Sequence, residues 1–156
     1  MLAAYLEGGS MRHMLVLAAI AVLAAAFVGT AAADRVYHTE RLELSGVGGA
    51  PGGGMVVNIH PNGPNVYAHE IYTLRQAVPG TYQVFLNVFP TSLNCTGPSA
   101  AIPTATITTN ASGNGRADVK FTPEDVGALR GMTFSLSWTV AGPATYVTAC
   151  TVVTLD

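Results

Sequence analysis

The sequence predicts an all-β protein, an antiparallel β-sandwich of seven or eight strands with one short helix. Three observations lead to this prediction. Short stretches in which apolar and polar residues alternate recur along the chain, and clusters rich in Gly, Pro and Asn separate them at roughly 8 to 12 residues. Only the segment 122–131 carries helix signals. Many short strands joined by tight turns are typical of two sheets packed over one core.

Residues 1–33 have the three parts of a secretory signal peptide. Arg12 supplies a positive amino-terminal region, Leu15–Val28 is an uncharged apolar run of 14 residues, and Ala31-Ala32-Ala33 form an A-x-A cleavage site before Asp34. The apolar run is shorter than the about 20 residues that a membrane-spanning helix needs. We therefore expect a cleaved, secreted protein, with an uncleaved membrane-tethered form as the alternative.

The true start of the chain is open, because Glu7 fits a signal peptide poorly and Met11 or Met14 could begin it. The remaining segment, 34–156, is long enough for one domain with a core and too short for two. The chain carries a net charge of −2 and no run of basic residues. Nucleic-acid binding, which needs a basic surface, is therefore not expected, and neither is a membrane segment after cleavage.

The first predicted strand is 35–44, and the segment 45–54 after it contains six glycines and is expected to be a flexible loop. Two strands follow at 55–59 and 66–72. If Asn62-Gly63 forms the turn between them, residue 59 lies opposite 66, 58 opposite 67 and 56 opposite 69.

In that register one face of the pair is polar and suggests a surface that contacts a sugar or a peptide, because aromatic rings with polar tips suit such ligands. The candidate ligand-binding residues are Asn58, His60, Asn65, Tyr67, His69 and Tyr72. The same register separates His60 from His69 by about 13 Å, so they cannot share a metal ion. If the register differs, His38, His69 and Glu70 are the alternative metal ligands, although the chain has no His-x-His pattern.

The strongest single strand is 81–89, which carries bulky residues on both faces and is expected to be central in a sheet. After a loop at 91–103, the segment 104–121 alternates on both sides of Asn110–Gly115 and predicts a β-hairpin with one buried and one wet face. EF-hand-like spacing occurs in this turn, but Phe121 stands where the chelating glutamate would be, so a turn is the better interpretation.

One short helix is predicted at 122–131, with Thr122 as its N-cap and Pro123 in its first turn. Strands at 132–140 and 145–155 end the chain. The two cysteines of the chain, Cys95 and Cys150, are expected to form a disulfide, since the chain is predicted to be exported. Two free buried thiols are the alternative.

The segment Thr106–Phe121, TITTNASGNGRADVKF, resembles a hairpin found in bacterial immunoglobulin-like domains of secreted and surface proteins. The resemblance covers those 16 residues and extends only loosely over the other β-rich segments. It implies an immunoglobulin-like sandwich that acts as a spacer or as an adhesion or ligand-binding module. The predicted disulfide and the single domain depart from the tandem arrays in which such domains occur.

No stretch of the sequence carries a catalytic motif. There is no G-x-S-x-G, no glycine-rich phosphate loop with a following lysine, and no CxxC. The only adjacent acidic pair, Glu124 and Asp125, is explained by the start of a helix. We therefore expect a secreted, non-catalytic binding or structural module without a cofactor and with an unknown extracellular ligand. The alternative is an extracellular metal-binding or redox protein that uses surface histidines.

Overall fold

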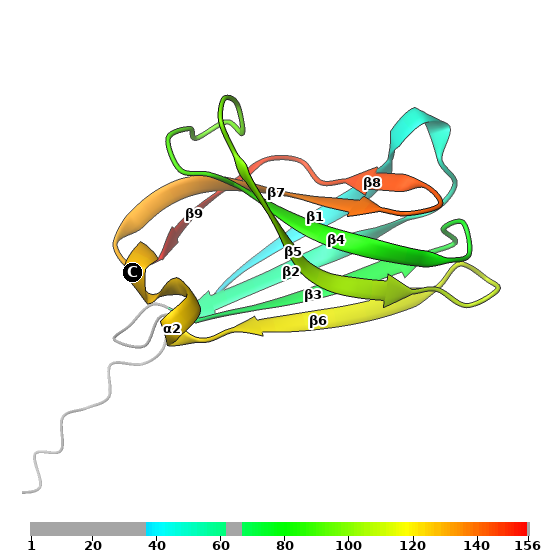
Figure 1. Ribbon diagram of the computed structural model, residues 1–156, viewed down its shortest axis with the longest axis horizontal. Coiled ribbons are helices and arrows are strands. Elements are labelled where there is room, and N and C mark those ends of the chain that lie inside the picture. Colours follow the sequence, from blue (N-terminus) through cyan, green and yellow to red (C-terminus); the bar gives the residue numbers. More distant parts are fainter. Residues whose placement is uncertain (1–36, 62–66, 156) are drawn as a thin grey trace, which may run out of the picture. The chain divides into compact units, whose positions relative to one another are not determined.

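Antiparallel strands make up most of the computed structural model, which describes residues 37–61 and 67–155 (Figure 1). The prediction of an antiparallel all-β protein with one short helix is confirmed, although the described residues form nine strands instead of seven or eight. The strands are β1 (Tyr37–Gly46), β2 (Gly53–Pro61), β3 (Ala68–Arg75), β4 (Thr81–Phe89), β5 (Ala100–Thr108), β6 (Gly115–Phe121), β7 (Met132–Ala141), β8 (Thr145–Val147) and β9 (Thr151–Leu155).

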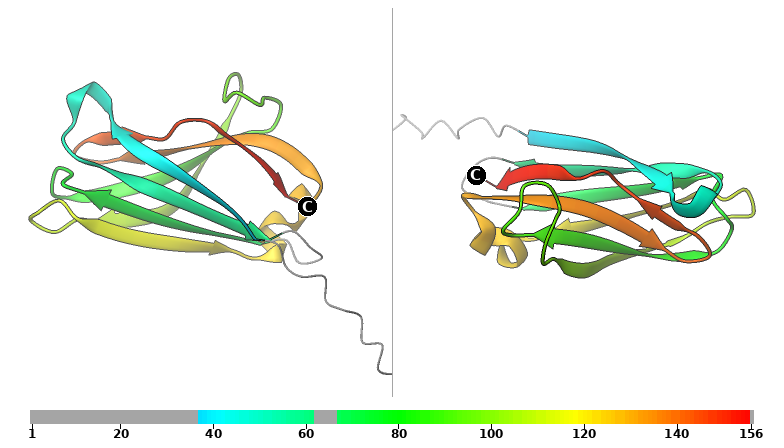
Figure 2. Two further views of the ribbon diagram at one scale, coloured as in Figure 1. Left: turned by 180° about the vertical axis from the view of Figure 1, so that it is seen from behind. Right: turned by 90° about the horizontal axis from the view of Figure 1, so that it is seen from above.

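The strands form one sheet in the order β5-β4-β7-β8-β1-β2-β3-β6, and β9 pairs with β7 beside β8. The sheet curls until its two edge strands, β5 and β6, lie near each other, so it is nearly a barrel (Figure 1). Two layers, β5-β4-β7 and β1-β2-β3-β6, are visible in the view from above (Figure 2). The link between them is narrow, because β8 pairs with β1 only at Ser45 and Gly46.

The predicted hairpin at 104–121 is wrong in its pairing. The turn itself is present, since Asn110 Oδ1 accepts hydrogen bonds from the backbone N–H groups of Ser112 and Asn114, each at 3.0 Å. Beyond the turn the two arms separate: β5 pairs with β4, and β6 pairs with β3. The turn is therefore an arch between the two layers, and each arm uses its hydrogen-bonding edge on a different neighbour.

Three other boundaries differ from the prediction. The segment 45–54 is only partly a loop, because β1 extends to Gly46, β2 begins at Gly53, and a short 3-10 turn, η1 (Val47–Gly49), lies between them. The predicted last strand is two strands, since residues 148–150 interrupt it and the register against β7 shifts by one residue. The strand predicted at 81–89 is confirmed at both ends and is central, with β5 and β7 as its neighbours.

The helix is shorter than predicted. It comprises α2 (Pro123–Val126) and a following 3-10 turn, η2 (Gly127–Leu129). Asp125 explains the start of the helix: its carboxylate accepts hydrogen bonds from the N–H and the hydroxyl of Thr122, at 2.7 and 2.8 Å. These bonds lower the pKa of Asp125, as expected for an acid at a helix N-terminus.

The core lies between the two layers and belongs to one compact unit, residues 35–156. Alternate residues of each strand point inward, and the inward residues of β4 and β7 form its centre. Trp138, Tyr72, Tyr82 and Tyr146 are the largest side chains that are fully buried there. Asn58, His60 and Glu70 are also buried, so the interior contains polar groups that must find partners inside.

Candidate functional site

The residues predicted to form one polar face are divided between the inside and the outside of the sheet. The structure pairs Asn58 with Glu70 and Val56 with Tyr72, a register that differs by three residues from the predicted one. An odd shift turns one strand over relative to the other. Asn58, His60 and Tyr72 consequently point inward and are buried, whereas Tyr67 and His69 are half-buried. Asn65 and the predicted turn at Asn62-Gly63 lie outside the described residues.

A first polar cluster lies inside the sheet where β1 and β2 pair. Glu40 Oε1 is 3.1 Å from His60 Nε2, and Glu40 Oε2 accepts a hydrogen bond of 2.9 Å from Asn58 Nδ2. Burial acts to raise the pKa of Glu40, but the bond to His60 and the charge of that imidazole outweigh it and lower the pKa. Glu40 is therefore held as a carboxylate.

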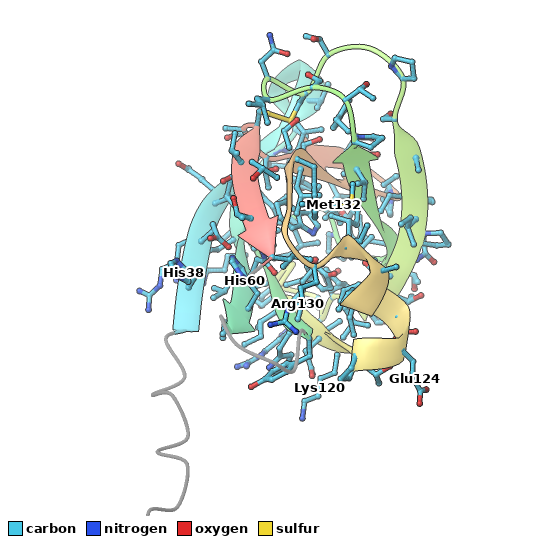
Figure 3. All side chains as sticks on the ribbon, turned by 90° about the vertical axis from the view of Figure 1, so that its left-hand side faces the viewer. His38, His60, Lys120, Glu124, Arg130 and Met132 are labelled. Atoms are coloured by element: carbon cyan, nitrogen blue, oxygen red, sulfur yellow. A yellow bond between two sulfur atoms is a disulfide. The ribbon has the colours of Figure 1, made fainter. Side chains whose placement is uncertain are left out.

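His60 has one nitrogen that is not used within this cluster. The side chain is 2% exposed, and its Nδ1 is buried without a hydrogen-bond partner among the residues that the structure describes. The ring of His38 stacks on that of His60, with centroids 5.4 Å apart, and the two side chains lie side by side in Figure 3. A histidine that bonds a carboxylate through one nitrogen and leaves the other free resembles the arrangement of many metal ligands.

A second polar cluster lies deeper and joins the two layers. Glu70 Oε2 accepts hydrogen bonds from the hydroxyl of Tyr72 and from Trp138 Nε1, the latter at 2.8 Å. Burial raises the pKa of Glu70 to about 7, although both bonds act to lower it. The hydroxyl of Tyr72 also lies 2.8 Å from Thr104 Oγ1, so the cluster connects β3 with both β5 and β7.

The position of Thr104 depends on an irregularity in β5. The register of β5 against β4 shifts where Val84 and Phe85 lie opposite Ala105 and Pro103, which leaves Thr104 as an extra residue. A bulge of this kind redirects a side chain, and Pro103 is tolerated because β5 is an edge strand. The bulge gives Tyr72 its second partner, and the alternating sequence pattern contains no sign of it.

The alternative metal ligands His38, His69 and Glu70 do not come together. His69 is on the outer side of β3, where its Nε2 lies 3.1 Å from the Asp118 carboxylate, and Glu70 is engaged inside by Tyr72 and Trp138. Across the part of the chain that the structure describes, no group of three or more His, Cys, Asp and Glu side chains is arranged to hold a metal ion. Instead, the structure brings His38 next to His60.

The predicted disulfide between Cys95 and Cys150 is confirmed. The two sulfur atoms are 2.09 Å apart and the Cα atoms 5.7 Å. It ties the loop after β4 to the residue before β9. Cys95 has a positive φ of 55°, and its N–H donates a 3.0 Å hydrogen bond to Ser135 Oγ.

A depression on the outer side of the sheet was not predicted from the sequence. We call the outward side of β1, β2, β3 and β6 the outer face. The depression has a volume of about 680 Å³ and lies where β2 begins and β3 ends, beside the middle of β1. Its lining residues are Arg41, Glu43, Gly52, Gly53, Gly54, Met55, Thr73, Arg75 and Gln76.

The outer face is also where the positive charge gathers. The described residues include five Lys and Arg side chains, and all except Arg130 project from this face. None of the four makes a salt bridge to another described residue. In the sequence, these charged residues occupy alternate positions of separate strands. Only the observed register shows that they share one face of the sheet. The four cations are Arg41, Arg75, Arg116 and Lys120.

Comparison with models of known protein families, with curated proteins and with solved structures finds no match to the chain. Among the residues that the structure describes, no helix has the length and apolar character needed to cross a membrane.

Proposed function

We propose that the protein is a secreted, non-catalytic module of the immunoglobulin-like β-sandwich kind, which binds an extracellular ligand through its outer face. The observation that carries this proposal is the contrast between the two sides of the sheet. Inside, Glu40 and Glu70 bond to neighbouring side chains, which explains them as structural groups. Outside, four cations project from the same face without ion pairs to described residues, and two of them, Arg41 and Arg75, line the depression.

Two features support the compartment and the fold type. A disulfide persists in an oxidising environment, and the signal-peptide pattern of residues 1–33 would deliver the chain to one. The packing of β5-β4-β7 over β1-β2-β3-β6 supports a sandwich, which the approach of β5 to β6 brings close to a barrel.

The test begins with the full chain expressed with its own amino-terminal segment. The mass of the protein recovered from the medium is expected to be that of a chain beginning at Asp34. Reduction of the disulfide is expected to increase this mass by two hydrogens. The secreted protein is then applied to an array of extracellular glycans and peptides. Binding that is lost in R116E/K120E and kept in R130E supports the outer face as the ligand surface. Equal binding by all three proteins would refute it.

A second candidate function is metal binding at His60, favoured by its buried Nδ1, which has no hydrogen-bond partner among the described residues. Because Glu40 contacts Nε2 of His60, Nδ1 is the nitrogen that could bind Zn²⁺ or Cu²⁺. Native mass spectrometry with each ion tests the idea. A stoichiometric adduct lost in H60N and kept in H69N supports it, and the absence of such an adduct contradicts it.

A further inference from the structure

We infer that the depression on the outer face binds an acidic saccharide, with the carboxylates of uronic-acid-type sugars held by Arg41 and Arg75. This inference rests on the proposed function and names its ligand class. Both arginines line the depression, both are exposed, and neither forms a salt bridge with another described residue. A guanidinium group binds a carboxylate through two parallel hydrogen bonds, which makes arginine the suited cation for this task.

The spacing of the arginines favours an extended ligand. Arg41 is on β1, next to the row of side chains Glu43, Met55 and Thr73, and Arg75 is on β3 at the other side of that row. Strand geometry places their Cα atoms on the order of 15 Å apart. A single inorganic anion would occupy one end of such a site, whereas a chain of sugars can place one acid group near each arginine.

The residues between the arginines suit hydroxyl groups. Glu43 offers a carboxylate acceptor, Thr73 a hydroxyl, and Gln76 an amide with both donors and an acceptor. Met55, which is 37% exposed, adds an apolar contact for the carbon face of a sugar ring. A volume of about 680 Å³ is within the range of small-molecule sites.

The glycines keep this surface open. A Cβ at Gly53, which lies opposite Arg75, would be 2.7 Å from the carbonyl oxygen of Leu44, and one at Gly52, where φ is +72°, would be 2.3 Å from that of Arg75. Side chains therefore have no room at these positions, and the backbone stays uncovered beside Arg75.

Densely charged polymers fit less well. Glu43 lies in the same depression as the two arginines and repels a second negative group placed against it. None of the described residues that line the depression is aromatic, so they offer nucleic-acid bases no ring on which to stack. A ligand with one acid group per sugar unit matches this mixture of charges better than nucleic acid or a heavily sulfated glycan.

The rim of the depression is held in an unusual conformation. Gln76 has a positive φ of 51°, which is uncommon for a residue other than glycine. Its N–H donates to Asn114 Oδ1 at 3.2 Å, and the next N–H, of Ala77, donates to the Gly113 carbonyl at 3.1 Å. The arch between β5 and β6 therefore positions the Gln76 side chain at the site, and strained backbone of this kind gathers at ligand sites.

The experiment is calorimetric titration of the secreted protein with galacturonic-acid oligosaccharides and with their methyl esters, in which a methyl group removes the charge of each acid group. We expect binding of the free acids, loss of binding to the esters, and an affinity reduced roughly tenfold in R41Q and in R75Q. R130Q removes an equal charge elsewhere and should stay within about twofold of the unaltered protein. Circular dichroism checks that all variants fold.

Several results would overturn the inference. Equal binding of acids and esters would remove the role of charge, and an equal loss in R130Q would remove the role of the depression. Tighter binding of duplex DNA or of a sulfated glycan would make the surface a general polyanion site. If no acidic glycan binds but another arrayed ligand does, and R116E/K120E loses it, this inference fails while the proposed function stands. If nothing arrayed binds, both fail.

Discussion

Glu70 illustrates how a buried acid can serve structure. It accepts hydrogen bonds from Tyr72 on its own strand and from Trp138 on the opposite layer, so one carboxyl group joins both halves of the core. Burial and the charge of Glu70 raise the pKa of Tyr72, which keeps its hydroxyl protonated and able to donate. The same burial makes the ionised form of Glu70 costly, as its raised pKa reflects.

The stability of the protein should consequently fall as the pH rises from about 4.5 to about 7. In this window the unfolded chain has released the proton of Glu70, whereas the folded chain, with a pKa of about 7, retains it. The total effect is on the order of 3 kcal/mol. In E70Q the amide oxygen still accepts hydrogen bonds, but the side chain has no ionisable group. The decrease in the free energy of unfolding between pH 4.5 and 7 that Glu70 causes should therefore vanish. Urea unfolding across the pH range measures it.

The exposed acid Glu124 provides the control, because E124Q makes the same chemical replacement on the surface and leaves the core unchanged. The comparison of E70Q with the unaltered protein isolates the contribution of Glu70, because every other ionisable group is the same in both proteins. If E70Q keeps the full slope, Glu70 is not the group responsible.

At the scale of elements, the arch between β5 and β6 joins the two layers of the sheet. Its turn docks on the loop after β3 through the Ala77 to Gly113 hydrogen bond, and its arms supply the two edges of the sheet. Gly113 has a φ of +71°, and a Cβ there would lie 1.9 Å from the Ala77 carbonyl oxygen. The close contact, and not only the backbone angle, requires glycine.

The variant G113A tests this contact against G97A. Both glycines have positive φ, but nothing lies within 4 Å of a Cβ at Gly97. G97A should therefore lower the free energy of unfolding only by roughly 1 to 2 kcal/mol, the cost of placing alanine in the left-handed conformation. G113A should cost at least about 2 kcal/mol more, because the arch must move away. Chemical denaturation of both variants gives the comparison, and equal costs would mean that the docking of the arch is weak.

Sequence patterns predicted the elements better than their partners. The alternation in 81–89 correctly identified a central strand, and the alternation in the arm that ends at Phe121 correctly separated its inner side from its wet side, because burial acts residue by residue. The pairing of 104–121 was wrong, since a turn and two alternating arms occur equally in a hairpin and in an arch. The prediction of one polar face was wrong for a related reason. The register between β2 and β3 depends on contacts across strands, and an odd shift places Asn58 and Tyr67 in different environments.

At the scale of the whole molecule, the disulfide between Cys95 and Cys150 holds the loop after β4 against the carboxyl-terminal strand. It closes a loop of 55 residues, and both of its ends lie next to β7. This pairing was predictable from the cysteine count together with the predicted signal peptide, because a chain with two cysteines that is expected to be exported has one possible intramolecular bridge.

Reduction of the disulfide should lower the free energy of unfolding by about 4 kcal/mol, since the unfolded chain gains conformational freedom. The midpoint of urea unfolding with and without a reductant measures this. The double variant C95S/C150S should match the reduced protein and should not respond to the reductant. A reductant-sensitive midpoint in that variant would point to another cause.

The near approach of β5 to β6 has a consequence for self-association. These two strands end the sheet, and an exposed strand edge readily pairs with another copy of the same chain. Here the short connection at 109–114 holds the two edge strands near each other. A protease cut in that connection would leave every strand in place but free both edges. The clipped protein should then aggregate at concentrations where the intact chain stays monomeric, which light scattering before and after limited proteolysis would reveal.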